Sequence, residues 1–358
     1  MEDVKVIKES TCTEEGVMET KCKNCEYISE VAVEKANHDY KDDFCTVCSA
    51  HKSIEYIKFE LLDDGWFASL DFVDTWERED LPINEIYIPS LTDTGEKVVG
   101  IGNFHDLRQL KKVVVPEGIK IIGEFVFGNC TFLEEVQFLG DRSSEFTIKE
   151  AAFSGCLKLK KLELPEKCYL VGGKTFYLCK NLKTLDTLIV GGDLGESVFE
   201  GCVSLQKVKF SDSVKSVGRY TFKDCYSLKE VDLGGITKIS FEMFRACSAL
   251  ETIVISESVT EIEGKAFYGC EKLKSVVLSK NFEKFGDFTF YACISLESIN
   301  IPKSLDYIGS AIFLGCNSLK EVHFEGTKEE WNNVPDHSDL MVNSKIERII
   351  CTDGVIEA

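Results

Sequence analysis

The chain has 358 residues, of which 44% are hydrophobic, and a formal net charge of −20 at pH 7. A chain with this much negative charge repels nucleic acid and anionic membrane surfaces. We therefore expect neither as a partner. No run of about 18 apolar residues occurs, which excludes a membrane-spanning helix. The first ten residues lack the apolar stretch of a signal peptide, so we expect either an intracellular protein or one whose leader is absent from this sequence.

Residues 1–52 contain a cysteine set of their own, in which two Cys-x-x-Cys pairs are separated by 19 residues. This spacing is typical of a four-thiolate zinc site, and a short polar segment needs such a staple to fold. The predicted ligands are Cys22, Cys25, Cys45 and Cys48. Disulfides and unmetallated thiols are the alternatives, and Cys12 or His38 could replace one ligand. In each case the role is structural, because four protein ligands leave no open position for chemistry.

The same segment resembles a cysteine-rich motif that occurs in tandem on Gram-positive surface proteins. The matching stretches are TCTEEG, KCKNC, NHDY and FCTVC. Three positions depart from that motif: Asn37 replaces the usual glycine before the histidine, and Glu26 and Ser49 replace the glycine that follows each second cysteine. These departures affect the turns that would hold a metal.

Residues 53–106 alternate apolar and polar side chains around Asp63-Asp64-Gly65, which predicts a β-hairpin. Two later phrases, INEIYIP (83–89) and KVVGIG (97–102), read as one degenerate repeat. We expect these residues to form an N-terminal cap, because a repeat array needs its open edge covered. Trp66 and Trp76 are predicted to lie in the core of this cap.

Residues 107–324 repeat one pattern at steps of 22 to 26 residues. Each unit predicts a short strand, a second extended piece and one helical turn, and it cannot bury its apolar side alone, so neighbouring units must stack. Ten units would give roughly 45 Å of sheet. The repeated cysteines are Cys130, Cys156, Cys179, Cys202, Cys225, Cys247, Cys270, Cys293 and Cys316; phenylalanine stands three residues before each, and leucine three residues after.

The repeated cysteines predict a ladder of buried, reduced thiols. A free thiol behaves as a small apolar side chain, and at such a turn it either fills space or satisfies backbone groups. Nine cysteines cannot pair fully among themselves. Cys168 falls where other repeats have Val214 or Val259, so it is expected in the core.

These columns closely resemble the BspA-like leucine-rich repeats, the 23-residue Treponema-type class. The phrases LKEVDLGGITKISFEMFRAC (228–247) and LESINIPKSLDYIGSAIFLGC (296–316) carry the match, which covers about residues 85–358. The resemblance implies a right-handed leucine-rich-repeat solenoid, mainly β with short helical turns, with about ten repeats and caps at both ends. It also implies a bacterial, extracellular or cell-surface location, since members of the family are typically adhesins or surface antigens.

Residues 325–358 resemble the closing phrase of such arrays, with Gly-Thr-x-x-x-Trp from Gly326 and Cys-Thr-Asp-Gly from Cys351. Thr327 followed by acidic residues predicts a capped helical turn, and residues 346–351 predict a last strand. The expected domains are therefore 1–52, a zinc-ribbon-like segment; 53–106, an N-terminal cap; 107–324, the repeat array; and 325–358, a C-terminal cap.

No motif of an enzyme is present. The chain lacks a glycine-rich phosphate loop, a nucleophile elbow and a zinc-protease helix, and its five histidines are scattered. Nothing in the sequence brings two carboxyl groups into a shielded pocket, which acid–base catalysis requires. We expect a protein that is not an enzyme and that has no cofactor other than a structural zinc.

Strand alternation sends two columns of side chains outward on the predicted sheet. One column contains Lys112, Glu135, Lys161, Thr184, Lys207, Glu230, Thr252, Ser275, Ser298 and Glu321; the other contains Val114, Gln137, Glu163, Asp186, Lys209, Asp232, Val254, Val277, Asn300 and His323. Charged residues dominate the first half, whereas small and apolar ones gather later. The predicted protein contact is Thr252, Val254, Ser275, Val277, Ser298, Asn300 and His323; the alternative is an ordinary mixed sheet face.

The predicted function is a non-enzymatic surface protein that presents this solenoid face to a protein on a host or neighbouring cell. The alternative is an intracellular protein-interaction scaffold, which the many thiols and the missing leader favour. A zinc-dependent role of residues 1–52 is a third possibility.

Overall fold

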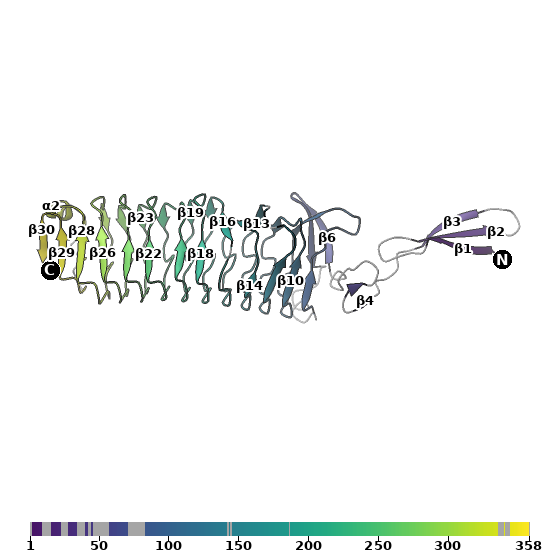
Figure 1. The fold of residues 1–358 in the computed structure, drawn as a ribbon, viewed down its shortest axis with the longest axis horizontal. Helices are drawn as coiled ribbons and strands as arrows, with labels where there is room; N and C mark the ends of the chain where they lie inside the picture. Colours follow the sequence, from purple (N-terminus) through teal and green to yellow (C-terminus); the bar gives the residue numbers. More distant parts are fainter. Residues whose placement is uncertain are drawn as a thin grey trace.

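The described residues from 57 to 357 form an elongated solenoid of about 11 mostly β turns (Figure 1). This computed structural model describes residues 57–70, 83–141, 143, 145–185, 187–335, 340 and 344–357. At the N-terminus it describes only the backbone of five strands, which are Glu2–Lys8 (β1), Gly16–Cys22 (β2), Ile28–Val33 (β3), Tyr40–Lys41 (β4) and Phe44–Cys45 (β5). The solenoid predicted from the repeat is confirmed.

The first strands of neighbouring repeats pair in parallel within three separate sheets, which follow one another along the solenoid and build one long face. Lys112, for example, lies opposite Glu85 on one side and Glu135 on the other. The strands of this face are Glu85–Tyr87 (β8), Lys112–Val115 (β10), Glu135–Phe138 (β12), Lys161–Leu162 (β14), Lys207–Lys209 (β18), Glu230–Asp232 (β20), Thr252–Val254 (β22), Ser275–Val277 (β24), Ser298–Ile301 (β26), Glu321–Phe324 (β28) and Arg348–Cys351 (β29).

The second extended piece of each repeat builds another parallel face, which begins with the predicted hairpin. Ile57–Leu62 (β6) and Gly65–Leu70 (β7) pair antiparallel around Asp63 and Asp64, as expected, and β7 then pairs in parallel with β9. The remaining strands are Val98–Ile101 (β9), Ile121–Ile122 (β11), Phe146–Ile148 (β13), Lys167–Leu170 (β15), Leu188–Val190 (β16), Asp193–Leu194 (β17), Ser216–Val217 (β19), Lys238–Ile239 (β21), Glu261–Ile262 (β23), Lys284–Phe285 (β25) and Tyr307–Ile308 (β27).

A ladder of aromatic rings fills the interior between the faces. From Phe127 to Phe313, successive phenylalanine rings stack with centroids 5.2–5.6 Å apart. All of these rings are buried, and so are the cysteines three residues after each of them. Cys168 is also buried, as predicted. Each ring covers the next one, so the core is continuous along the array.

The prediction of a helical turn before each cysteine is wrong, because the structure has no helix at these positions. In the repeat around Phe267, the turn begins and ends at left-handed residues, with φ of 57° at Lys265 and 71° at Gly269. The N–H groups of Lys265, Phe267 and Gly269 point toward the next repeat, where each donates to a carbonyl oxygen at 2.8–2.9 Å. A right-handed helix would keep those donors within its own segment. The turns therefore form a third hydrogen-bonded side of the solenoid.

The C-terminal cap contains a short helix and a final hairpin. Helix α2 spans Lys328–Asn332, and the hydroxyl oxygen of Thr327 accepts a hydrogen bond from the backbone N–H of Glu330, which confirms the predicted cap. Strand β29 extends the first face, and Gly354–Glu357 (β30) pairs with it antiparallel. The buried indole of Trp331 packs edge-on against Phe324, which covers the end of the core.

Candidate interaction surface

The outward columns of the first face have the register that the repeat predicts. Lys112 lies opposite Glu135, which lies opposite Lys161, and Lys207 lies opposite Glu230. Val114 is an exception, because it is buried although its column faces outward. These pairs bring together residues that are 23 or 26 positions apart in the chain.

The first half of this face is a ladder of paired charges. The Nζ atom of Lys161 lies 2.8 Å from Glu135 Oε1 and 3.1 Å from Glu163 Oε1. The hydrogen bonds to Glu135 and Glu163 raise the pKa of Lys161. Two repeats further along, Lys207 Nζ lies 2.7 Å from Glu230 Oε1. Because these charges are exposed and satisfy one another, they contribute little to stability and leave little net field.

The structure brings the predicted contact residues together as one neutral patch on β22, β24 and β26. Thr252 pairs with Ser275 and Val254 with Val277, while Ser275 pairs with Ser298. The two valines are 68% and 56% exposed, which is high for large apolar side chains on a folded sheet. Hereafter the neutral patch means Thr252, Val254, Ser275, Val277, Ser298 and Asn300.

Charged groups border the neutral patch on the C-terminal side as well. Asn300 pairs with His323, the last of the predicted contact residues, so His323 lies at the edge of the patch. Its Nε2 atom is 4.0 Å from Glu321 Oε2, and the same carboxylate contacts the guanidinium of Arg348. The patch is therefore an uncharged island of three strands between two charged borders.

A shallow cavity of about 250 Å³ lies on the same face, lined by Thr184, Leu185, Thr187, Leu188, Lys207 and Lys209. It forms where the repeat pattern is irregular and Thr184 makes only an isolated bridge to Lys207. Thr187 occupies a position where an apolar residue is expected. Its buried hydroxyl donates to the carbonyl oxygen of Pro165, which satisfies the polar group.

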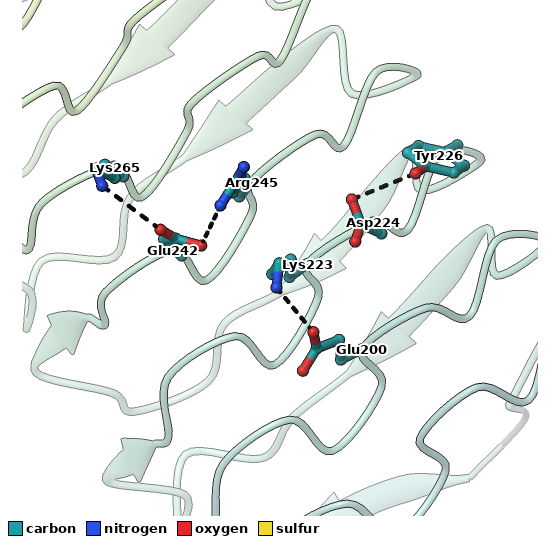
Figure 2. A network of polar contacts seen from close by, with 7 residues as sticks. All are labelled: Glu200, Lys223, Asp224, Tyr226, Glu242, Arg245 and Lys265. Carbon is teal, nitrogen blue, oxygen red and sulfur yellow. Dashed lines mark hydrogen bonds and ion pairs between the residues drawn. The ribbon is translucent and has the colours of Figure 1, made fainter. Parts of the chain in front are cut away.

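The turn side of the solenoid carries a polar network that sequence reasoning missed (Figure 2). Glu242 is buried between Arg245 Nη1 at 2.8 Å and Lys265 Nζ at 3.9 Å, and its hydrogen bond raises the pKa of Arg245. In the preceding repeats, Lys223 Nζ lies 3.0 Å from Glu200 Oε1. The signal was present in the column one residue after each phenylalanine, which reads Glu200, Lys223, Arg245, Tyr268 and Tyr291.

Aromatic rings complete this network. The guanidinium of Arg245 lies 5.2 Å from the ring centroid of Tyr268, which in turn stacks on Tyr291 at 4.5 Å. These cations have carboxylate partners on the same side of the solenoid, so the network bonds adjacent turns to one another. We therefore interpret it as part of the scaffold that keeps the first face rigid.

The repeat sequence itself matches the family described as BspA type leucine rich repeat region, in six copies, at residues 97–229, 192–270 and 237–355. The chain belongs to this BspA-type family. Families of this repeat are generally non-enzymatic and generally bind proteins. No curated protein matches the chain.

Several solved structures resemble this BspA-type protein at low sequence identity. A leucine-rich repeat protein from Bacteroides ovatus is 22% identical, with 83% of this chain and 98% of that one covered and a TM-score of 0.42. A leucine-rich cell surface protein from Faecalibacterium prausnitzii is 19% identical, over 84% and 98% of the two chains, with a TM-score of 0.32. The pneumococcal vaccine antigen PcpA is 19% identical, over 83% and 97%, with a TM-score of 0.37.

The predicted zinc ligands of this BspA-type protein, Cys22, Cys25, Cys45 and Cys48, lie outside the residues whose side chains are described. Among the described residues, no group of three or more histidine, cysteine or acidic side chains is placed to hold a metal ion. Within the same residues, no helix is long and apolar enough to cross a bilayer.

Proposed function

We propose that this BspA-type chain is a cell-surface protein that binds another protein through the outer side of its first face. The exposed pair Val254 and Val277 at the centre of the neutral patch carries the proposal. Protein interfaces have cores depleted in charge and polar rims, and the patch with its two charged borders has that arrangement.

The charged borders favour binding here over the rest of the face. Covering the lysine–glutamate ladder would require removing water from exposed charges, which opposes association unless the partner replaces that water well. Covering valine, threonine and serine requires much less desolvation, and burial of two valines contributes favourable free energy of about 1.5–3 kcal/mol each at most. A partner is therefore expected to seat its contact over β22, β24 and β26.

The surface location is the second half of the proposal, and it rests on the membership of the BspA-type family. In intact cells of the native organism, an externally added protease should cleave the protein, while a cytoplasmic marker stays whole. Protection of the chain under those conditions would favour the alternative intracellular scaffold. The reduced thiols do not decide between the two locations, because they are buried in the array and an oxidant does not reach them.

Binding is tested with a panel of immobilised extracellular matrix proteins and the full chain in solution. The double variant Val254→Asp with Val277→Asp should lose at least about tenfold in affinity for any matrix protein that the native chain binds. The matched control is Val171→Asp, because Val171 is 52% exposed and lies outside the patch. Equal binding by the native chain and the double variant would contradict the proposed contact.

A further inference from the structure

We infer that the partner of the neutral patch is a second copy of the same chain, docked face to face about a two-fold axis that runs parallel to the strands between β22 and β24. This inference rests on the proposed binding role of the first face and names its occupant. Figure 1 shows the strands of that face stacked in order along the solenoid, from β18 through β22 and β26 to β28 and β29. A two-fold axis along the strands keeps their direction and reverses their order, so each outward column meets the same column of the second copy.

The apolar residues restrict where the axis can lie. With the axis between β22 and β24, Val254 lies opposite the second copy's Val277, and this contact occurs twice because the interface is isologous. Thr252 then lies opposite the second copy's Ser275. If the axis lay on β22 instead, Val277 would face the carboxylate of Asp232. If it lay between β24 and β26, Val254 would face His323.

The charges select the same arrangement. With the axis between β22 and β24, Lys207 lies opposite the second copy's Glu321, again twice. If the axis lay on β24, Glu230 would meet Glu321 and Lys207 would meet Arg348, and like charges placed directly opposite one another oppose association. Of the four positions compared, only the one between β22 and β24 joins valine to valine and lysine to glutamate.

The net charge of the chain does not prevent this association. Residues 107–358 contain 31 basic and 36 acidic residues, a net charge of −5, whereas the whole chain has −20. Most of the excess negative charge therefore belongs to residues 1–106. The strands that meet in the dimer, β18 to β28, belong to the nearly balanced part of the chain.

The size of the contact predicts a weak dimer. Six rungs spaced by about 4.8 Å, each contributing about three residues of 3.3 Å, give a face of roughly 300 Å² per copy. Stable complexes bury about 800 Å² per partner, so we expect a dissociation constant weaker than about 10 μM. Many copies on one surface would meet many copies on another, and such multivalency strengthens weak contacts.

Sedimentation velocity of the full chain between about 10 μM and 1 mM tests the inference. The native chain should shift from monomer to dimer over this range. Lys207→Glu and Glu321→Lys should each weaken the dimer at least about tenfold, because each places like charges opposite one another twice. An equimolar mixture of these two variants should recover the native association, since both contacts in the mixed dimer then join opposite charges.

Recovery in the mixture cannot arise within one chain, because Lys207 and Glu321 lie five rungs apart, roughly 24 Å. The matched control is Lys161→Glu, which breaks a similar lysine–glutamate pair outside the contact and should leave dimerisation unchanged. A chain that stays monomeric at the highest concentration overturns the inference, and so does a mixture that fails to recover. If such a monomeric chain still binds a matrix protein through Val254 and Val277, the proposed function stands without the dimer.

Discussion

The thiol of Cys270 donates a hydrogen bond to the backbone carbonyl oxygen of Phe244 in the preceding turn, with Sγ and oxygen 3.1 Å apart. The same contact, at 3.0–3.2 Å, recurs for all nine cysteines of the column. The carbonyl belongs to the phenylalanine that also stacks in the ring ladder. The cysteine column therefore bonds successive turns together, which explains why a thiol stands there and not a larger apolar side chain.

Replacing Cys270 with alanine should lower the free energy of unfolding by about 1–3 kcal/mol. The change leaves the buried carbonyl oxygen of Phe244 without its donor and opens a small cavity. Cys270→Ser is the matched control, because serine retains a donor at the same place, and it should lose less stability than alanine. Urea unfolding followed by circular dichroism measures both. A larger loss for serine would show that the thiol acts only by filling space.

Replacing Phe267 with alanine should destabilise the array by about 3–5 kcal/mol. Its ring stacks between Phe244 at 5.2 Å and Phe290 at 5.3 Å, so the change removes contacts with both neighbouring turns. Because repeats depend on their neighbours, hydrogen exchange should speed up most near residue 267 and then fall off along the array. Phe267→Leu should lose less. Uniform faster exchange over the whole array would contradict coupling between nearest neighbours.

Ala292→Gly should stabilise the protein by about 1 kcal/mol. Ala292 has a φ of 58°, a left-handed conformation that is strained for alanine and not for glycine. The equivalent positions in the adjoining repeats are already Gly269 and Gly315. Ala266→Gly is the control. This buried alanine has no positive φ, so its replacement by glycine should make the protein less stable than the native chain. Thermal unfolding of the two variants decides: a lower melting temperature for Ala292→Gly would show that its methyl group packs usefully.

The cysteine column should make the protein sensitive to alkali. Burial raises the pKa of the Cys270 thiol from 9.0 to about 12, so the thiol stays protonated in the folded state while an unfolded thiol ionises above pH 9. The stabilisation is fully present below pH 9 and is lost as pH rises toward 12, by about 1.4 kcal/mol per pH unit for each such thiol.

The measurement is the unfolding free energy between about pH 9.5 and 11 for the native chain and Cys270→Ser. The serine variant should show the shallower decline, because one titrating thiol is gone. Lysine titration is common to both chains and cancels in the comparison. Identical slopes would mean that Cys270 ionises equally in both states.

Residues 1–52 are predicted to bind one zinc ion per chain through Cys22, Cys25, Cys45 and Cys48. Elemental analysis of the purified chain should find the metal, and Cys22→Ser combined with Cys45→Ser should abolish it. The melting of the array should not change, since repeats interact with their neighbours only. Zinc-free protein whose four thiols react with a thiol reagent would support unmetallated thiols, and zinc-free protein whose four cysteines do not react would support disulfides.

The register of the outer face could be predicted because a strand has a period of two and the repeat has a period near 23. Those two periods together place Val254 beside Val277 before any coordinates exist, and the observed pairing agrees. The turn before each cysteine could not be predicted in the same way. At the first left-handed position of each turn, residues as different as Lys265 and Phe288 occur, so no residue type signals it. Glycine recurs at the second position, as at Gly269 and Gly315, but a glycine alone does not predict this turn.

By itself, the amino-acid sequence determined the repeat, the solenoid, the buried phenylalanine and cysteine columns, and which side chains face outward, because those follow from periodicity and burial alone. Only the tertiary structure decided that the thiols donate to the carbonyl oxygens of the preceding turn, that Glu242 is buried between Arg245 and Lys265, and that Val114 is covered. These are contacts between turns, and they depend on the distance and rotation from one turn to the next, which a one-dimensional pattern does not contain.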